Sequence, residues 1–343
     1  IAERESSTTE DLEFALSLAE KAMGLDPTNS MIMDTLGWIY FQLGDSNLAL
    51  EHLQNSIKNG GDNSVILEHL GDVYLKMGNI KKAQDNLDFI KKQKQTSYDS
   101  LTVSENKLKA FILAAGVSRR LYPHTYNTPK CLLDVGGQPI IHYQLEALES
   151  IDITNVTMIV GYHREILMEH VTSNFPNLKF NFLVNHHYFE TNTAFSVYLG
   201  RDILRSDDHV LMNADVVYPK ELLEKTVQSR FSTVLAVDAK VCGREEVKVI
   251  DGGENKIVAI GKDIIESQCL GEFIGVAKLS KEFAGLFSES LEHLIDAGGV
   301  NDYFEAGIQH LLDKTDVHFE DVSEYPCLEI DFLEDLKSAR KLF

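Results

Sequence analysis

The sequence predicts two folded domains: an all-α domain over residues 1–95 and an α/β domain with a parallel, doubly wound sheet over residues 108–343. Three observations support this prediction. The first 95 residues contain an internal repeat with a period of 34 residues. After residue 108, apolar runs of strand length alternate with amphipathic segments of helix length, which is typical of parallel sheets. The 343 residues, 44% apolar and 25% charged, are enough for two hydrophobic cores.

The repeat relates two sets of six residues that lie 34 positions apart. They are Leu36, Gly37, Tyr40, Gly44, Ala49 and Leu53, which recur as Leu70, Gly71, Tyr74, Gly78, Ala83 and Leu87. Small residues let antiparallel helices approach each other, and Gly or Pro separates successive units, so this pattern resembles the tetratricopeptide repeat. The resemblance implies either a groove for a protein or peptide partner or a spacer or dimerisation module.

Composition narrows the class of function. A net charge of −21 argues against a protein that coats nucleic acid, so negative substrates must be met by local Arg, Lys and metal. The four cysteines match no zinc or disulfide spacing, which favours reduced thiols and a cytoplasmic location. We expect no membrane span and find no signal peptide, although a chain that begins Ile-Ala-Glu looks truncated.

The two domains are joined by a predicted linker over residues 96–107, where the helical period is lost and the sequence becomes polar. Beyond it the alternation can be read in order along the chain. We expect strands at residues 110–115, 156–160, 179–184 and 209–212, and helices near residues 140–150, 164–173 and 194–205.

The stretch from Lys109 to Asp134 has the character of a phosphate-binding loop. Its buried strand ends at Gly116, where backbone N–H groups become free to converge on an anion. Arg119 and Arg120 add charge to the loop, and Lys130 returns as a point charge after a turn bounded by proline.

The same stretch resembles the nucleotidyltransferase signature L-A-A-G-x-G-[ST]-R-L-x-P-x-T-x-x-x-P-K, with Ser118 at its second Gly and Arg119 at its hydroxyl residue. The resemblance implies a Rossmann-like, glycosyltransferase-A-type domain. It also implies that Arg120 holds the triphosphate and that Lys130 acts at the reaction centre. The remaining nucleotide-binding positions of this loop are Leu113, Ala114, Ala115, Gly116, Val117 and Ser118.

Two acidic residues are predicted to bind a metal ion. Asp215 follows the apolar run 209–212, and the carboxyl ends of strands in open α/β sheets are where ligands bind. Asn213-Ala-Asp215 resembles the family's N-G-D segment, which supplies a magnesium carboxylate. A second carboxylate is expected, and Glu329-Ile-Asp331 resembles the ending of the branch that makes cytidylyl derivatives of phosphocholine. The resemblance therefore implies Mg²⁺ on Asp215 and Asp331, while Asp331 could also cap the following helix.

Further segments resemble the parts of this branch that contact the substrates. Asn185 and Asn192 match its N-P-x-Y-x-x-x-N-N-x-x-S segment and are expected to contact the nucleotide, with capping of the following helix as the alternative role. The acceptor would lie beside five residues, for which packing or solvation is the alternative role. They are Lys248, Lys262, Glu272, Tyr303 and Glu305.

Together these resemblances imply a Mg²⁺-dependent transfer of CMP from CTP to a small phosphorylated alcohol, such as phosphocholine, or to a phosphonate, with release of pyrophosphate. Two alternatives remain open. One is a nucleotidyltransferase for a sugar or inositol 1-phosphate. The other is a non-catalytic scaffold that senses nucleotide and binds protein through its repeats, which the presence of Arg120, Lys130, Asp215 and Asp331 disfavours.

Overall fold

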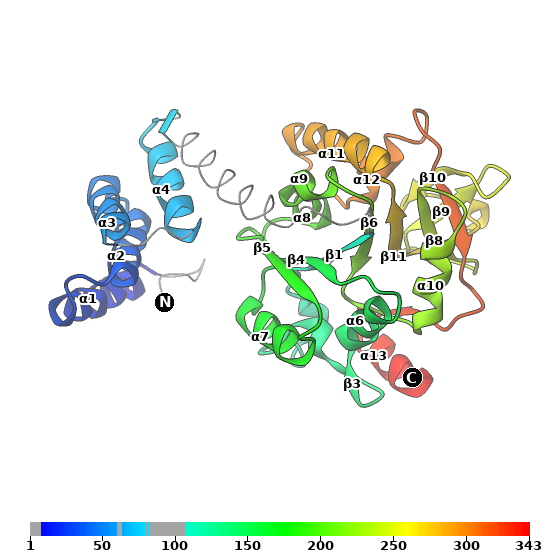
Figure 1. Ribbon diagram of the computed structural model, residues 1–343, viewed down its shortest axis with the longest axis horizontal. Coiled ribbons are helices and arrows are strands. Elements are labelled where there is room, and N and C mark those ends of the chain that lie inside the picture. Colours follow the sequence, from blue (N-terminus) through cyan, green and yellow to red (C-terminus); the bar gives the residue numbers. More distant parts are fainter. Residues whose placement is uncertain (1–7, 60–63, 80, 83–107) are drawn as a thin grey trace. The chain divides into compact units, whose positions relative to one another are not determined.

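The structure, a computed structural model, describes residues 8–59, 64–79, 81–82 and 108–343. The chain divides into two compact units, Ile1–Ser104 and Glu105–Phe343 (Figure 1). The predicted linker over residues 96–107 lies outside the described residues, as do the repeat positions Ala83 and Leu87.

The first unit contains four helices in its described part: α1 (Thr9–Leu25), α2 (Ser30–Gln42), α3 (Ser46–Lys58) and α4 (Ser64–Lys76). Gly37 brings α2 against α3, since a Cβ there would lie 2.6 Å from Leu53 Cγ. Gly44 and Gly78, 34 residues apart, both have positive φ at the ends of helices. The helices thus agree with the period, while the assignment to the tetratricopeptide family and the partner it implies stay predictions.

Four parallel strands form the centre of the sheet in the second unit. They are β6 (His209–Asn213), β1 (Lys109–Ala114), β4 (Asn155–Val160) and β5 (Lys179–Val184), in that spatial order. All four lie where the alternation of apolar runs predicts them. Buried Phe111 and Leu113 on β1 belong to one core, and buried Ala110 and Ile112 belong to the other, as the two-residue period of a strand requires.

The rest of the sheet corrects the prediction of a parallel sheet. Beyond β6 lie β11 (Gly271–Leu279), β9 (Lys248–Asp251) and β10 (Ile257–Gly261), all antiparallel to their neighbours on this path. β8 (Val234–Asp238) also pairs antiparallel with β11, and β12 (His318–Asp321) pairs with β8. The loop that joins β9 to β10 is short, and such a loop permits only antiparallel pairing.

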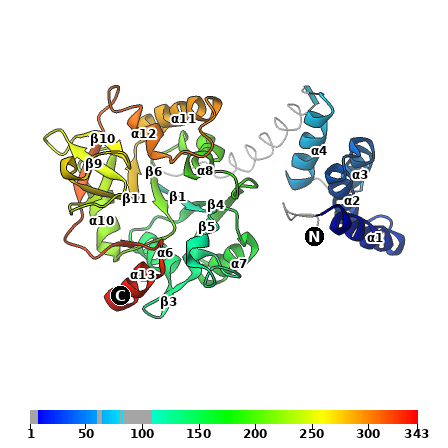
Figure 2. The same cartoon turned by 180° about the vertical axis from the view of Figure 1, so that it is seen from behind.

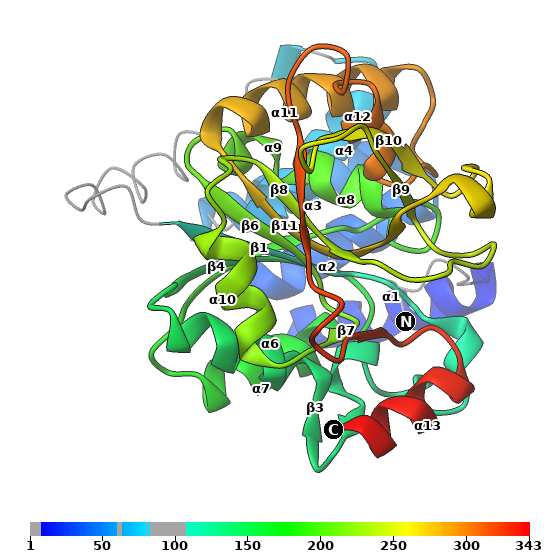
Figure 3. The same cartoon turned by 90° about the vertical axis from the view of Figure 1, so that its right-hand side faces the viewer.

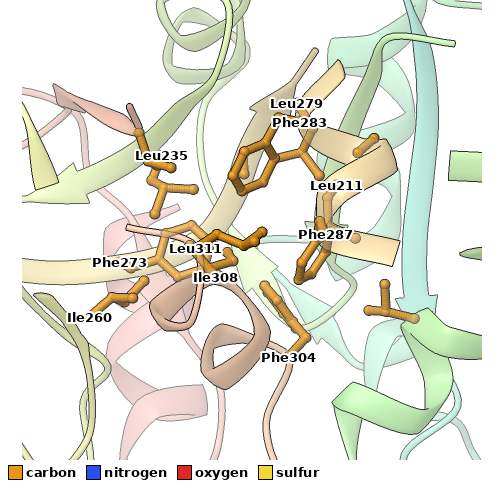
Figure 4. Packing of buried hydrophobic residues seen from close by; sticks show 14 of the residues in the cluster. Leu211, Leu235, Ile260, Phe273, Leu279, Phe283, Phe287, Phe304, Ile308 and Leu311 are labelled. Atoms are coloured by element: carbon orange, nitrogen blue, oxygen red, sulfur yellow. The ribbon is translucent and has the colours of Figure 1, made fainter. Parts of the chain in front are cut away.

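Helices cover both faces of this sheet (Figures 1 and 2). One face carries α8 (Thr193–Leu199), α9 (Arg201–Leu204), α11 (Lys281–Asp296) and α12 (Glu305–Gln309). Figure 4 shows Phe283 and Phe287 of α11 among the buried side chains of this face. The other face carries α6 (Ile140–Ser150), α7 (Arg164–Asn174) and α10 (Lys220–Gln228). The single helix predicted at residues 194–205 is two, α8 and α9, which meet at Gly200 beside the Phe111 ring.

The C-terminal segment returns to the centre of the domain. β13 (Leu328–Glu329) pairs with β7 (Val216–Val217), and α13 (Leu333–Leu342) follows it (Figure 3). A third core joins α13 to the hairpin of β2 (Asp134–Val135) and β3 (Gln138–Pro139). Its buried residues are Leu121, Leu133, Val135, Ile140, Val217, Ile330, Leu336 and Ala339. Within the described residues, no helix is both long enough and apolar enough to cross a membrane.

Candidate active site

Three carboxylates from two distant segments of the chain meet beyond the carboxyl end of β6. The pairing of β7 with β13 sets Glu329 opposite Val216, and the Ile330 N–H donates to the Asp215 carbonyl at 3.1 Å. One oxygen each of Asp215, Glu329 and Asp331 consequently lies within 4.8 Å of the others. The expected pair of acids is thus a group of three.

The turn that carries Asp215 is held by buried neighbours. Gln144 of α6 donates from Nε2 to the carbonyls of Asn213 and Val216, both at 2.8 Å. Gly275 of β11 has a φ of 75°, and a Cβ there would lie 2.4 Å from Asn213 Nδ2. The position of Asp215 therefore depends on a buried amide and on a residue without a side chain.

Lys130 joins two of the three acids. It lies in the short 3₁₀ helix η2 (Lys130–Leu132), and its Nζ is 2.7 Å from Asp215 Oδ2 and 2.7 Å from Asp331 Oδ1. Burial disfavours the charged ammonium, but the two carboxylates outweigh burial and raise the pKa of Lys130. Arg120 Nη1 contacts the other oxygen of Asp331 at 3.3 Å. Arg120, Lys130, Asp215 and Asp331 are therefore one cluster.

The acidic cluster suits a hard divalent cation. Asp215 Oδ1 is buried and has no hydrogen-bond partner among the described residues, and carboxylate oxygens are the ligands that Mg²⁺ prefers. Burial and then the charges of Asp215 and Asp331 raise the pKa of Glu329 to about 8. We did not predict Glu329 as a ligand, although residues two apart in an extended strand share a face and Asp331 was predicted.

The Gly-rich loop leaves β1 beside this cluster. The Leu113 carbonyl accepts from Ala214 N–H and the Ala115 carbonyl from Tyr162 N–H, both at 3.1 Å, and Gly116 is exposed. Ser118 has φ 54° and ψ 49°, the left-handed region that favours glycine. The departure from the family signature at this position therefore retains the backbone conformation that a glycine would adopt.

This loop is tied to its neighbours by aromatic side chains that the sequence reading did not single out. The Arg119 guanidinium lies 3.9 Å from the centre of the Phe189 ring. Tyr162 donates from its hydroxyl to the Tyr126 carbonyl at 2.8 Å. No motif marked these contacts, because each joins segments that are far apart in the chain.

The predicted nucleotide contact of Asn185 requires correction. Its side chain is 1% exposed, and Nδ2 donates to Thr191 Oγ1 and Ser196 Oγ, both at 3.1 Å. Its Oδ1 accepts from His187 N–H. The side chain of Asn185 therefore shapes its own loop, and its amide has no N–H left to donate to a nucleotide. Asn192 caps α8 by accepting from Thr193 N–H at 2.8 Å, so its side-chain oxygen has a structural partner.

Lys248, predicted to bind the acceptor, also requires correction. Its side chain is buried, and Nζ donates to the carbonyls of Arg244, Glu246 and Lys262. An ammonium has three N–H donors, so none remains for an acceptor phosphate. Lys248 holds loops together.

The other four predicted acceptor residues lie on β11, on nearby loops and, for Glu305, at the start of α12. Lys240 Nζ is 2.6 Å from Glu272 Oε2, and Lys262 Nζ is 4.4 Å from the centre of the Tyr303 ring. Burial raises the pKa of Glu305 to about 7. The charge of Glu272 contributes to the raised pKa of Glu329, and that of Lys262 to the lowered pKa of Asp331, so this group is within electrostatic reach of the acidic cluster.

Comparisons with known proteins agree with this geometry. Residues 109–246 match the family described as nucleotidyl transferase. The CTP:phosphoglutamine cytidylyltransferase of Campylobacter jejuni is 27% identical over 67% of this chain and 98% of its own length. The choline-phosphate cytidylyltransferase of Streptococcus pneumoniae is 28% identical over 68% of this chain and 98% of its own length. A solved structure of the CTP:phosphocholine cytidylyltransferase of S. pneumoniae has the same fold, with a TM-score of 0.57 at 24% identity, over 68% of this chain and 98% of that one.

Proposed function

We propose that this chain, a transferase enzyme, moves CMP from CTP to a small phosphorylated alcohol or phosphonate and releases pyrophosphate. The observation that most supports this proposal is the cluster of Lys130, Asp215 and Asp331 beside a Gly-rich loop. Both curated relatives named above are cytidylyltransferases that act on phosphorylated compounds. The alternative of a non-catalytic scaffold is disfavoured, because these relatives are enzymes and the chain has the lysine and acidic cluster described above.

In this reaction an oxygen of the acceptor phosphate forms a bond to the α-phosphorus of CTP. The bond from the α-phosphorus to the oxygen that bridges to the β-phosphate breaks, and its electron pair leaves with pyrophosphate. The acceptor phosphate is already ionised near neutral pH, so no general base is required. Catalysis consists of positioning and of neutralising negative charge.

The side chains of the site have separable roles in this proposal. Gly116 and the N–H groups near it bind the triphosphate, and Arg120 neutralises its charge. Lys130 stabilises charge on the reacting phosphoryl group and keeps Asp215 and Asp331 in register. Asp215, Glu329 and Asp331 would hold Mg²⁺, which neutralises phosphate oxygens when bound.

A direct test measures pyrophosphate release from CTP, UTP, ATP and GTP with phosphocholine, 2-aminoethylphosphonate and glucose 1-phosphate as acceptors. The proposal expects release from CTP with a phosphorylated alcohol or a phosphonate. Release with glucose 1-phosphate alone would refute it and would favour a sugar-phosphate nucleotidyltransferase.

A further inference from the structure

One transverse row of the sheet crosses four strands beside the acidic cluster. Gly261 of β10 pairs with Lys248 of β9, Lys248 with Glu272 of β11, and Glu272 with Asp238 of β8. Adjacent strands are about 4.8 Å apart, so the row is short. Lys262 directly follows one end of the row, and Lys240 is two residues beyond the other. The two lysines thus flank Glu272.

Lys240 forms ion pairs with both acids at its end of the row. Its Nζ lies 2.6 Å from Glu272 Oε2 and 3.3 Å from Asp238 Oδ2, and its side chain is still 36% exposed. It borders a cavity of about 530 Å³, together with Val241, Cys269 and Leu270. A lysine that is paired on one side and open on the other can bind an additional anion.

At the other end of the row, Lys262 forms a cation–π contact with the Tyr303 ring. Its Nζ lies 4.4 Å from the centre of the Tyr303 ring, and its charge also acts on the buried Glu305. The two features that would attract a quaternary ammonium are an acid and an aromatic ring. In this structure both features already have a cation, since Lys240 pairs with Glu272 and Lys262 contacts the Tyr303 ring.

We propose that the acceptor carries a carboxylate in addition to its phosphate or phosphonate, and that the ammonium of Lys240 binds this carboxylate. The inference rests on the proposed function and narrows its acceptor class. An acceptor ammonium, as in an amino acid, competes with Lys240 for Glu272. In a zwitterion the acceptor carboxylate on Lys240 makes up for that contact, so every charge keeps a partner. A quaternary ammonium alone must displace a lysine from its partner, which costs a charge-assisted hydrogen bond.

The test compares four acceptors in pyrophosphate release from CTP: O-phosphoserine, 3-phosphoglycerate, phosphoethanolamine and phosphocholine. We expect O-phosphoserine to give the highest kcat/KM, at least about 10-fold above phosphoethanolamine, which differs from it only by the carboxylate. Lys240→Gln should lower this ratio toward one, and Lys240→Arg should restore part of it. A matched control is Lys256→Gln, since Lys256 forms an exposed pair with Asp316 at the opposite end of β9.

The outcomes separate the two proposals. Phosphocholine as the best acceptor, or an acceptor ratio that Lys240→Gln leaves unchanged, would overturn the inference and leave the proposed function standing. Absence of pyrophosphate release from CTP with these four acceptors and also with 2-aminoethylphosphonate would overturn both. Circular dichroism and the melting temperature identify a variant that fails to fold. Lys240→Arg then decides alone, because a planar guanidinium in place of the ammonium keeps the charge but alters its geometry and should change the acceptor ratio.

Discussion

The site contains two lysines that each lie between two carboxylates, and the two arrangements differ in burial and symmetry. Lys130 is 2.7 Å from both Asp215 and Asp331, and its side chain is 10% exposed. Lys240 is 2.6 Å from Glu272 but 3.3 Å from Asp238, and its side chain is 36% exposed. Buried pairs are screened little by solvent, whereas half-exposed pairs contribute little and rearrange readily.

This difference separates fixed chemistry from adaptable recognition. The Lys130 cluster is attached to a buried strand, a helix and a C-terminal strand pair, so its geometry is set before any ligand binds. Lys240 follows the end of β8 in a loop and borders a cavity. We infer that the Lys130 cluster serves the reaction step, and that the Lys240 cluster adjusts to the acceptor.

The largest expected effect comes from breaking the buried cluster. Asp215→Asn removes the charge of a proposed metal ligand and of a partner of Lys130, so we expect kcat to fall by about 10³-fold. The melting temperature should change little, because Gln144 holds this turn through backbone carbonyls. The measurement is pyrophosphate release at saturating CTP.

The matched change in the exposed cluster is Asp238→Asn. Because Asp238 is the more distant partner of Lys240, we expect less than about a 5-fold loss in kcat/KM. Equal losses in Asp215→Asn and Asp238→Asn would contradict the division between a reaction cluster and a recognition cluster, and undiminished turnover in Asp215→Asn would refute the metal assignment.

The second effect concerns Glu329, the acid that sequence reasoning did not assign. Glu329→Gln should lower kcat by about 10²-fold and raise the Mg²⁺ concentration needed for half-maximal rate by about 10-fold. A titration with Mg²⁺ at fixed CTP measures both. Glu324→Gln is the control, because Glu324 forms an exposed pair with Lys225. A Mg²⁺ requirement unaltered by the change at Glu329 would exclude it as a ligand.

The contrast between the two lysines also explains what the sequence could predict. Lys130 lies in a continuous signature whose spacing reports the strand, the loop and the turn together. The central strands β1, β4, β5 and β6 were likewise predicted from local apolar runs. These parallel strands and the matched family confirm an α/β nucleotidyltransferase fold. Local patterns therefore sufficed where one segment carries its own chemistry.

Other features depend on pairing between distant segments, which no local pattern specifies. Lys240 acquires its role from the register that sets Asp238 opposite Glu272, and Glu329 from the pairing of β13 with β7. Asn185 and Lys248 were assigned to ligands because they match a motif, but neighbouring hydroxyls and carbonyls use their polar groups. The antiparallel half of the sheet was missed for the same reason.

The third effect is on the free energy of unfolding and concerns Glu305, one of the predicted acceptor residues. Burial raises the pKa of Glu305 from 4.5 to about 7, so the folded state binds more protons than the unfolded state between these values. Stability from this group is therefore present below about pH 4.5 and is lost as pH rises through 7. The Glu305→Gln variant should lack this loss, and its free energy of unfolding at pH 8 should exceed that of the parent by about 3 kcal/mol.

The measurement for Glu305 is urea unfolding at pH 5 and at pH 8. At pH 5 the carboxyl is largely neutral in the folded state, so the two proteins should be close in stability. A difference between variant and parent that is the same at both pH values would show that Glu305 does not titrate in this window.

The smallest expected effect is at Ser118, in the Gly-rich loop beside the Lys130 cluster. Ser118 has a φ of 54°, a conformation that costs a residue with a Cβ about 1 kcal/mol relative to glycine. Ser118→Gly should therefore raise the free energy of unfolding by up to about 1 kcal/mol, less the entropy that glycine adds to the unfolded chain. Ser118→Val should lower it, because β-branched residues fit this region worst. Urea unfolding measures both changes, and equal stabilities would mean that this loop is not held in the left-handed conformation.

Because Thr125 donates to the Ser118 carbonyl at 2.9 Å and fixes the peptide that follows, we expect the strain to be retained in the parent protein.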